Sequence, residues 1–536
     1  MNIQWYFKGV VLVFIFLFFV GLALFNVNDL GLQYDELLFG NAALGCIDET
    51  SFINGKLGQV PILLMPYIGA LKAYLYFPIL KLVPASTLLI RIIPILITCG
   101  TIFLFYRSIE LISNNSFFAL WTTFFLAIDP NVVYWNTFDV GPNAIEFFIK
   151  MLAVLYMIKF YKEERLRYIL YLIIILSLGL FNKLNFIWFI NVSVLLGFIW
   201  LLVNHWNSNN DSLRRTHIIK VFFLMSIYFI AAFSYILFFV KSENDLGAFA
   251  FDYSSMKLLN KVRNLNYLLN GQSFYSYIFK ATTTNLFSLL YYCFTLIILL
   301  IGGVLSLYNL KYKKDTVFTY LFLYSFLIIV CTLIQVVITK EATAPWHVFT
   351  IYPFYTVLIS SSIYLMYSFF SNHIIRKGVI LSVLMILCCR AVIFSNYMIG
   401  FNDITEKNKK INIHWDPAII PLAEYCKTQD KKVGILDWGI FTQLLVLDPK
   451  KGKYSELFWS LNDEMDSVQL KSYYDDHIKG KKIVFVDYNF ERTKSDGFNR
   501  VLKNFRRISE YNNHPLKIEK EINRGSKKVF IVYSLQ

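Results

Sequence analysis

Long apolar runs separated by short polar segments dominate the first 400 residues of the chain. A helix that crosses a bilayer needs about 20 mostly apolar residues. Runs of this kind predict about eleven spans. They lie at residues 8–27, 88–106, 117–134, 143–160, 168–182, 184–203, 219–240, 284–309, 317–338, 344–370 and 379–398. We therefore expect a polytopic α-helical membrane domain over residues 1–400.

Basic residues gather in alternate loops between these spans, for example Arg107, Arg165 and Arg376. Short loops rich in Lys and Arg stay on the cytoplasmic side of a membrane. The pattern predicts a cytoplasmic N-terminus. The loops then expected to face outward are 28–87, 135–142, 241–283 and 339–343. The tail from about residue 400 is also expected outside, because long domains cross whatever their charge.

Two of the outward loops carry apolar residues and Lys at loose helical spacing. One is the run GKLGQVPILLMPYIGALKAYLYFPILKLVP at residues 55–84, and the other is MKLLNKVRNLNYLL at 256–269. Such stretches are typical of helices that lie in the membrane interface. We expect an interfacial outer helix in each loop.

The tail, residues 401–536, alternates strand and helix patterns. KKVGILDWGI and KKIVFVDYNF are short β-rich runs, and LKIEKEINRGSKKVFIVYSL reads as a terminal hairpin that turns at Arg524 and Gly525. The tail is therefore predicted to be a small extracytoplasmic α/β domain.

The distribution of charged residues also divides the chain near residue 400. Residues 1–400 hold 27 Lys and Arg and 17 Asp and Glu, whereas residues 401–536 hold 24 and 19. The tail thus has the charge density of a soluble domain and the first part does not. The net charge of +15 does not indicate nucleic-acid binding, because most of the excess lies in short loops between apolar spans.

The first candidate for chemistry is Asp35 with Glu36, in GLQYDELLFGNAAL just after the first span. A carboxylate at the membrane surface can take a proton from an attacking hydroxyl. The alternative is a solvated pair that caps the next helix, since Asp is a good N-cap residue.

The second candidate is Asp139, in NTFDVGPNAIEFF between the third and fourth spans. An acid just before a helix start is also commonly a cap. Glu146 follows inside the fourth span, where an acid is costly and suggests a function unless it stays hydrated.

Several cations lie on the outward side: Arg91, Lys183 and His347 near the ends of spans, and Lys72 and Lys81 on the expected interfacial helix. Lysines in such places often only extend to lipid headgroups. Lys183 and Arg91 are less easily explained in this way, because the positive-inside rule disfavours them there. They suggest an anionic partner such as a lipid phosphate. His347 could donate to the same phosphate, or be an ordinary hydrogen-bonded helix residue.

The sequence shows no evident pair of opposite charges at the middle of the spans and no internal repeat. Transporters usually place ionisable groups near the midplane, on broken helices in repeated halves. We therefore expect an enzyme that acts on a lipid of the outer leaflet, with a polytopic transporter or flippase for a lipid-linked or small anionic substrate as the alternative.

The order of these features resembles the membrane glycosyltransferases of the GT-C fold, most closely the family 39 type. That group includes the protein O-mannosyltransferases and the bacterial lipid A aminoarabinose transferases. The matching segments are YDELLFGNAAL, MPYIGALKAYLY, LLIRIIPIL, AIDPNVVYWNTFDVGPNAIEFFIKMLAVL, LGLFNKLNFIW and APWHVFTIYPF.

The resemblance implies an inverting transfer of a sugar from a polyprenyl-phosphate donor to a protein, lipid or glycan acceptor, at the bacterial cytoplasmic membrane. It implies that Asp35 is the general base, assisted by Glu36. It implies that Asp139 orients the acceptor, or holds a divalent cation in members that use one. The leaving phosphate would be stabilised by Lys183 and Arg91, and less directly by Lys72 and His347.

Overall fold

The computed structural model describes residues 3–45, 55–206, 211–239, 255–281, 286–312, 317–450, 452–462, 464–489 and 496–535. The chain divides into two compact units. Unit 1 comprises Met1–Phe25, Met65–Leu71 and Arg91–Tyr397, and unit 2 comprises Asn26–Leu64, Lys72–Ile90 and Met398–Gln536. Most of the loop at residues 28–87, which was expected to face outward, therefore belongs to one unit with the tail, although they are far apart in sequence.

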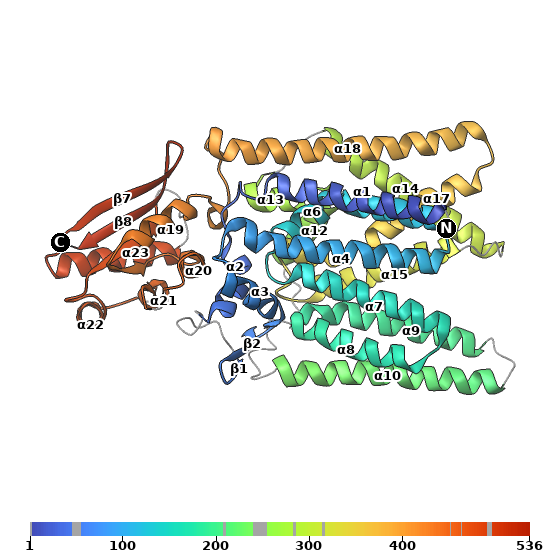
Figure 1. Cartoon of the computed structure of the whole chain (residues 1–536), viewed down its shortest axis with the longest axis horizontal. Coiled ribbons are helices and arrows are strands. Elements are labelled where there is room, and N and C mark those ends of the chain that lie inside the picture. The colour runs from blue at the N-terminus through green and yellow to red at the C-terminus, as the bar shows by residue number, and fades with distance from the viewer. Residues whose placement is uncertain are drawn as a thin grey trace. The chain divides into compact units, whose positions relative to one another are not determined.

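Unit 1 is built almost entirely from helices (Figure 1). Its helices are α1 (Ile3–Phe25), α4 (Thr87–Ser113), α5 (Ser116–Ala127), α6 (Pro130–Thr137), α7 (Asn143–Glu163), α8 (Leu166–Asn182), α9 (Ile187–Trp206), α10 (Asp211–Phe239), α12 (Ser255–Leu269), α13 (Ser273–Phe279), α14 (Leu286–Lys311), α15 (Val317–Ile338), α16 (Pro345–Phe349), α17 (Phe354–Phe369) and α18 (His373–Glu406). The first residues of α4 and the last of α18 fall in unit 2.

Among the described residues, seven helices are long and apolar enough to cross a membrane: α1, α4, α9, α10, α14, α15 and α18. The bent pair α5 and α6, with an angle of 58° between them, makes an eighth if it counts as one span. Helices α8 and α17 are shorter apolar helices. The protein thus has the helices of a multi-pass membrane protein, and eleven crossings stay a prediction.

Helices of unit 1 that follow one another in sequence often pack side by side, as α7 does with α8 and α9 with α10 (Figure 1). Helix α17 packs against both α14 and α15. Its contact with α14 is close, because a Cβ atom on Gly302 would lie 2.3 Å from the Ser362 hydroxyl oxygen. Small residues at a crossing let two apolar helices approach in this way.

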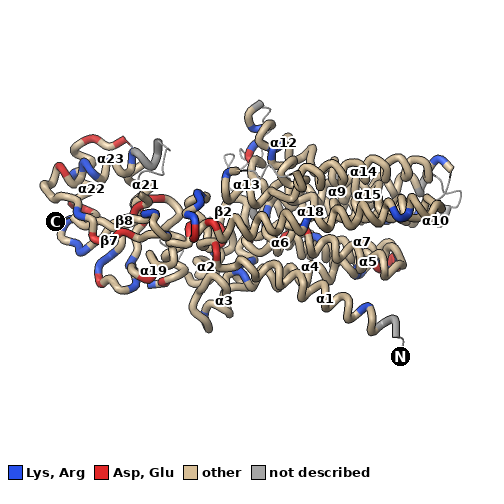
Figure 2. Tube along the Cα trace, turned by 90° about the horizontal axis from the view of Figure 1, so that it is seen from above, with Lys and Arg blue, Asp and Glu red and all other residues tan. Residues whose placement is uncertain are grey.

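Charged residues are sparse along the long helices and dense in the tail (Figure 2). This agrees with a membrane-embedded unit 1, since an ionised side chain in contact with lipid is costly.

The first outer loop differs from its prediction. After α2 (Tyr34–Leu44), residues 55–65 form an antiparallel hairpin of β1 (Gly55–Leu57) and β2 (Val60–Met65). Gly58 takes the left-handed conformation, with φ +61°, in the tight turn that joins them. The helix α3 begins only at Leu71 and ends at Leu82. A helix is therefore present in the second half of 55–84 only, and its position in the membrane interface stays a prediction.

The second outer loop contains the predicted helix, α12 (Ser255–Leu269), which has one apolar and one charged face. Its residues 241–254 lie outside the described part of the chain.

The tail is an α/β domain, as predicted. Its five strands are β4 (Lys432–Ile435), β5 (Tyr454–Glu456), β6 (Ile483–Tyr488), β7 (Leu516–Arg524) and β8 (Lys527–Leu535). They are ordered β5-β4-β6-β8-β7, with β5, β4 and β6 parallel. The last two strands form the predicted hairpin, with Gly525 at φ +56° in its turn.

In the described part of the tail, five helices accompany this sheet: α19 (Ile419–Thr428), α20 (Ile440–Leu447), α21 (Phe458–Leu461), α22 (Ser467–His477) and α23 (Asp496–Tyr511). Helix α23 is strongly amphipathic, and its Val501, Phe505 and Ile508 are buried in a cluster with Phe485 of β6. This apolar face holds the helix on the sheet.

Helix α2 packs on α20 of the tail within unit 2. The Asn41 side-chain amide donates to the Thr442 carbonyl at 2.9 Å, and the Gly31 amide donates to the Trp415 carbonyl at 2.8 Å. A Cβ atom on Gly31 would lie 2.3 Å from the Asp416 carbonyl oxygen, so this close approach requires glycine. The start of α2, which carries Asp35, is thereby fixed to the tail.

Candidate functional site

The first turn of α2 is closed by a capping box. Gln33 is the N-cap residue, and its side-chain oxygen accepts from the amides of Asp35 at 2.6 Å and Glu36 at 3.2 Å. The buried Glu36 carboxylate accepts in return from the Gln33 amide at 3.0 Å. Glu36 therefore stabilises the first turn of α2.

Asp35 is not the N-cap residue, contrary to the simplest alternative. It lies two residues inside the helix start, half-buried, with its carboxylate 3.5 Å from the Gln33 side-chain nitrogen. The positive end of a helix stabilises a carboxylate in this position. Of the two neighbouring acids, Asp35 is the more accessible one.

Lys72 of α3 is buried in unit 2. Its Nζ lies 4.9 Å from the ring centre of Phe39 and 5.8 Å from that of Tyr76. This cation is enclosed by aromatic rings and does not extend to a lipid surface. Lys81 is exposed and fits that simpler explanation.

The loop between α6 and α7 gathers two predicted residues in unit 1. Asp139 is buried, and one of its carboxylate oxygens accepts from the amides of Asn143 at 2.9 Å and Ala144 at 3.1 Å. It therefore caps α7, as an acid before a helix start often does. The guanidinium carbon of Arg91, also buried, lies 4.5 Å from the ring centre of Phe138.

Lys183 adds a third charge to the same place. It stands in extended conformation where α8 ends, and it bridges to Ile68 of β3 (Ile68–Gly69). Its Nζ donates to the Asn143 side-chain oxygen at 3.1 Å. The Nζ is also 4.0 Å from the place where a Cβ of Gly141 would lie. The start of α7 thus brings Arg91, Asp139 and Lys183 together within unit 1.

His347 lies on α16, between α15 and α17. Its Nδ1 accepts from the Ala344 amide at 3.3 Å, and its ring centre lies 6.0 Å from that of Trp188. An imidazole that accepts at Nδ1 carries its proton on Nε2 when it is neutral, so His347 has a donor to offer.

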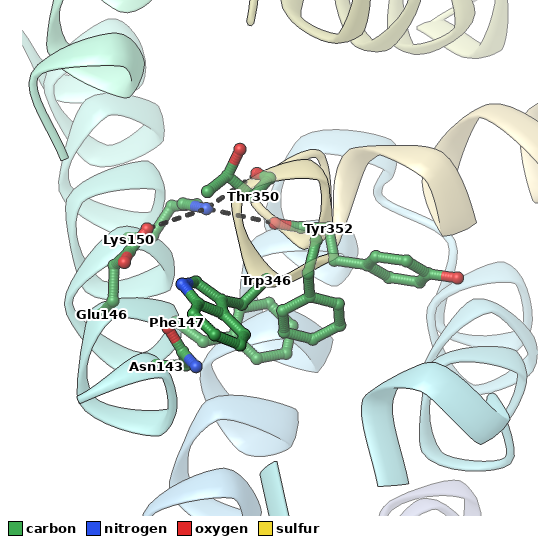
Figure 3. Close-up of a pocket in the computed structure, with 8 residues that line it drawn as sticks. Asn143, Glu146, Phe147, Lys150, Trp346, Thr350 and Tyr352 are labelled. Carbon is green, nitrogen blue, oxygen red and sulfur yellow. Dashed lines mark hydrogen bonds and ion pairs between the residues drawn. The ribbon is translucent and has the colours of Figure 1, made fainter. Parts of the chain in front are cut away.

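A small pocket lies between α7 and α16 (Figure 3). Its lining residues are Asn143, Glu146, Phe147, Lys150, Trp346, Phe349, Thr350 and Tyr352. Asn143 is shared with Lys183, so the pocket adjoins the charged group at the start of α7. Lys150 was not singled out from the sequence, because a Lys inside an apolar run looks like an isolated charge.

A second buried charge pair contradicts an expectation from the sequence. Arg390 of α18 lies 2.8 Å from a carboxylate oxygen of Asp129, at the bend between α5 and α6. Both side chains are almost fully buried. Tyr352 donates to the other Asp129 oxygen at 3.1 Å, and Arg390 donates to Tyr291 at 3.2 Å. The sequence analysis, which found no evident pair of opposite charges at the middle of the spans, missed this pair of residues from two predicted spans.

Two carboxyl groups in unit 2 lie at the carboxyl ends of neighbouring parallel strands. Asp437 comes just after β4, and Asp487 lies near the end of β6. Burial raises the pKa of Asp487 to about 7. Burial, together with the charge of Asp487, holds the pKa of Asp437 well above its usual range. This pair therefore retains protons that exposed carboxyls would release.

Metal-ligating side chains do not gather in the part of the chain that the structure describes: no group of three or more His, Cys, Asp and Glu could hold an ion there. We assign no residue to a divalent cation.

No protein-family model matches the sequence, and no curated protein matches it significantly.

Proposed function

We propose that this protein is an inverting glycosyltransferase of the bacterial cytoplasmic membrane, which moves a sugar from a polyprenyl-phosphate donor to an acceptor on the outer face. The proposal includes the GT-C fold of the resembled family, eleven spans, a cytoplasmic N-terminus and an extracytoplasmic tail. The observation that supports it best is the group of buried charges at the start of α7 in unit 1, where Lys183, Arg91 and Asp139 come together.

Lys183 and Arg91 suit the departing phosphate. When the bond between the sugar C1 and the phosphate oxygen breaks, that oxygen keeps the electron pair, and polyprenyl phosphate leaves with an added negative charge. Fixed cations in a site that excludes water stabilise such a charge strongly. In this proposal His347 donates from Nε2 to the same phosphate, and Lys72 has an indirect role, since its ammonium is enclosed by aromatic rings.

Asp35 suits the acceptor. As the acceptor oxygen forms its bond to C1 on the opposite face of the sugar, its proton passes to the Asp35 carboxylate. Glu36 supports Asp35 by closing the helix turn that carries it. Asp139 holds the start of α7 and orients the acceptor.

The test uses purified protein in lipid with a panel of polyprenyl-phosphate sugars, and envelope extract as the acceptor. Release of polyprenyl phosphate is followed in wild type and in Asp35→Asn. Removal of a general base lowers a rate by roughly 100-fold or more, so we expect release to fall by that factor.

Asp29→Asn is the matched control, because Asp29 is also half-buried in the segment before α2 and accepts from the Asn26 side chain. It should keep wild-type release. Unchanged release in Asp35→Asn, at equal thermal stability, would assign the base to another residue. Absence of release with every donor would contradict the proposal itself.

The Asp129–Arg390 pair favours the second candidate, a transporter or flippase for a lipid-linked or small anionic substrate. Such proteins place ion pairs on broken helices inside the membrane. This candidate predicts movement of the lipid-linked sugar across proteoliposomes with no polyprenyl phosphate released.

A further inference from the structure

Three aromatic side chains meet at the first residue of α2, within unit 2. The ring centre of Tyr34 lies 4.3 Å from that of Trp438 and 5.2 Å from that of His414. The rings of His414 and Trp438 also meet edge-on, at 5.5 Å between centres. Aromatic pairs at such distances and tilts attract each other beyond the burial of their surface. Tyr34 is therefore held by two rings of the tail.

Trp438 lies in the short loop between β4 and α20. The Leu436 amide at the start of this loop donates to a carbonyl of β6 at 2.9 Å. Gly439 at its end takes φ +92°, and a Cβ atom there would lie 3.2 Å from Cδ1 of Tyr34. Glycine allows both this backbone conformation and this close approach. The loop is thus anchored to the sheet and packed directly against α2.

Further contacts fix the segment just before α2 to the tail. The Gln443 side-chain amide of α20 donates to the Leu32 carbonyl, and also to the His414 carbonyl at 3.0 Å. Gln443 is almost fully buried. The bonds of Gly31 and Asn41 to the tail add a contact before the first turn and one beyond it. The tail therefore sets the rotation of α2 about its own axis.

The rotation of α2 decides where Asp35 points. Consecutive residues of a helix are about 100° apart around its axis, so a fixed direction for Tyr34 also fixes the direction of the next side chain. Side chains end about 5–6 Å from the axis, and a rotation of about 10° moves such an end by about 1 Å. A displacement of that size at a reacting group can lower a rate about 100-fold. Small changes in the contacts of Tyr34 are therefore large for a general base at Asp35.

We infer that Trp438 is a positioning residue for the proposed transfer, and that it acts on Asp35 through Tyr34. This inference rests on the proposed function, in which Asp35 accepts the proton of the acceptor. It gives the tail a part in the reaction, because the tail then holds the general base in its working direction. A Trp438 that only stabilised the tail would leave the turnover of folded protein unchanged.

The experiment compares kcat and KM for polyprenyl-phosphate sugar in wild type, Trp438→Leu and Trp438→Phe. Trp438→Leu should lower kcat roughly 10- to 100-fold. The KM for the donor should stay within about twofold, because the cations proposed for its phosphate, Lys183 and Arg91, belong to unit 1. Trp438→Phe keeps an aromatic ring against Tyr34 and should recover kcat to within about fivefold of wild type.

A double variant tests whether Trp438 acts through Tyr34. Tyr34→Leu removes the same contact from the side of α2, and should lower kcat by about the same factor as Trp438→Leu. The double variant should then lose no more than the larger single loss. Losses that multiply in the double variant would overturn the route through Tyr34. If Trp438→Leu does not fold, Tyr34→Leu with wild-type kcat would overturn it equally.

Trp459→Leu is the matched control, because Trp459 is 48% exposed on α21 of the same tail. It should keep the wild-type kcat. Hydrogen exchange separates a local effect from a global one. Amides in the first turn of α2 should exchange faster in Trp438→Leu, while those of β4 and β6 keep their wild-type rates.

Wild-type kcat in Trp438→Leu, with Asp35→Asn inactive, would overturn the inference and leave the proposed function standing. A loss of kcat that Trp438→Phe does not recover, with faster exchange in β4 and β6, would also overturn it, because Trp438 would then only stabilise the tail. A wild type that releases no polyprenyl phosphate with any donor would remove the proposed function and the inference together.

Discussion

The Asp129–Arg390 pair either stabilises the interior of unit 1 or forms part of a transport path. Variants that remove one partner distinguish these two roles. Arg390→Met removes the guanidinium and keeps an apolar side chain of similar length. The pair is 2.8 Å apart, with side chains 2% and 1% exposed. Truncation of one partner of a buried pair costs about 3–5 kcal/mol, because the other charge is left uncompensated.

The surroundings set the magnitude for this pair. Arg390 also donates to the Phe125 carbonyl and to the Tyr291 hydroxyl, so Arg390→Met breaks three contacts at once. In Asp129→Asn, by contrast, the side-chain oxygen that remains can still accept from the Tyr352 hydroxyl and the Asn131 amide. We therefore expect Asp129→Asn to cost less than Arg390→Met, by about one hydrogen bond to a charged group, or about 2 kcal/mol.

The assay is a double-mutant cycle on equilibrium unfolding of the full chain in mixed micelles. The double variant Asp129→Asn/Arg390→Met should be more stable than the sum of the single losses predicts, with a coupling of about 1–3 kcal/mol. Strictly additive losses in the free energy of unfolding, or single losses below about 0.5 kcal/mol, would refute the stabilising role, because substitutions at surface sites have effects of that size. A variant that folds at wild-type stability yet changes flux of lipid-linked sugar would instead support the transporter.

Two predictions concern other parts of the chain. Because native Asp437 and Asp487 retain protons that an unfolded chain releases above about pH 4, the free energy of unfolding of the tail should fall as pH rises from about 4 to about 7. The fall from Asp487 is at most about 4 kcal/mol. Hydrogen exchange of the β4 and β6 amides should show this fall in wild type and a smaller fall in Asp487→Asn, in which only Asp437 still contributes, and equal slopes would contradict it. Gly69→Ala should lower thermal stability by roughly 1–3 kcal/mol, because its Cβ would lie 2.0 Å from the Phe181 carbonyl oxygen. Gly21→Ala, with open space around it, is the control, and equal melting of both variants would refute the close contact.

The helices of unit 1 could be predicted from the sequence because long apolar runs have few other stable arrangements in a membrane. The cap at Asp139 could also be predicted from the sequence, because an acid followed by Gly and Pro is a local signal for a helix start. The hairpin of β1 and β2 was not. Its apolar residues also fit a helix at loose spacing. In the structure a tight turn at Gly58 joins two strands instead.

The joining of the tail to the segments between residues 26 and 90 in unit 2 could not be predicted, because its contacts join distant segments. The side chain of Asn41 meets the carbonyl of Thr442, 401 positions along the chain. No local pattern indicates such a partner. The Asp129–Arg390 pair was more accessible to reasoning, since each charge lies inside a predicted span. A charge in such a place is costly without a partner of opposite sign. Other charges, among them Glu146 and Lys150, also lie inside predicted spans, so the sequence indicated that a partner was needed but not which one.

Burial alone does not identify the lysines that bind a ligand. Lys150 and Lys261 are both buried, and both donate to pairs of backbone carbonyls near helix ends, Lys261 to Val337 and Thr339. These ammonium groups complete the backbone hydrogen bonds that a helix end leaves open. Lys183 donates to a side-chain amide at the rim of a pocket, and that amide can turn to a ligand without opening a helix. This difference in partner, which the sequence does not contain, is consistent with the proposal that Lys183, already suggested by its place in the sequence and by the resemblance, binds the donor phosphate, whereas Lys150 stabilises the fold.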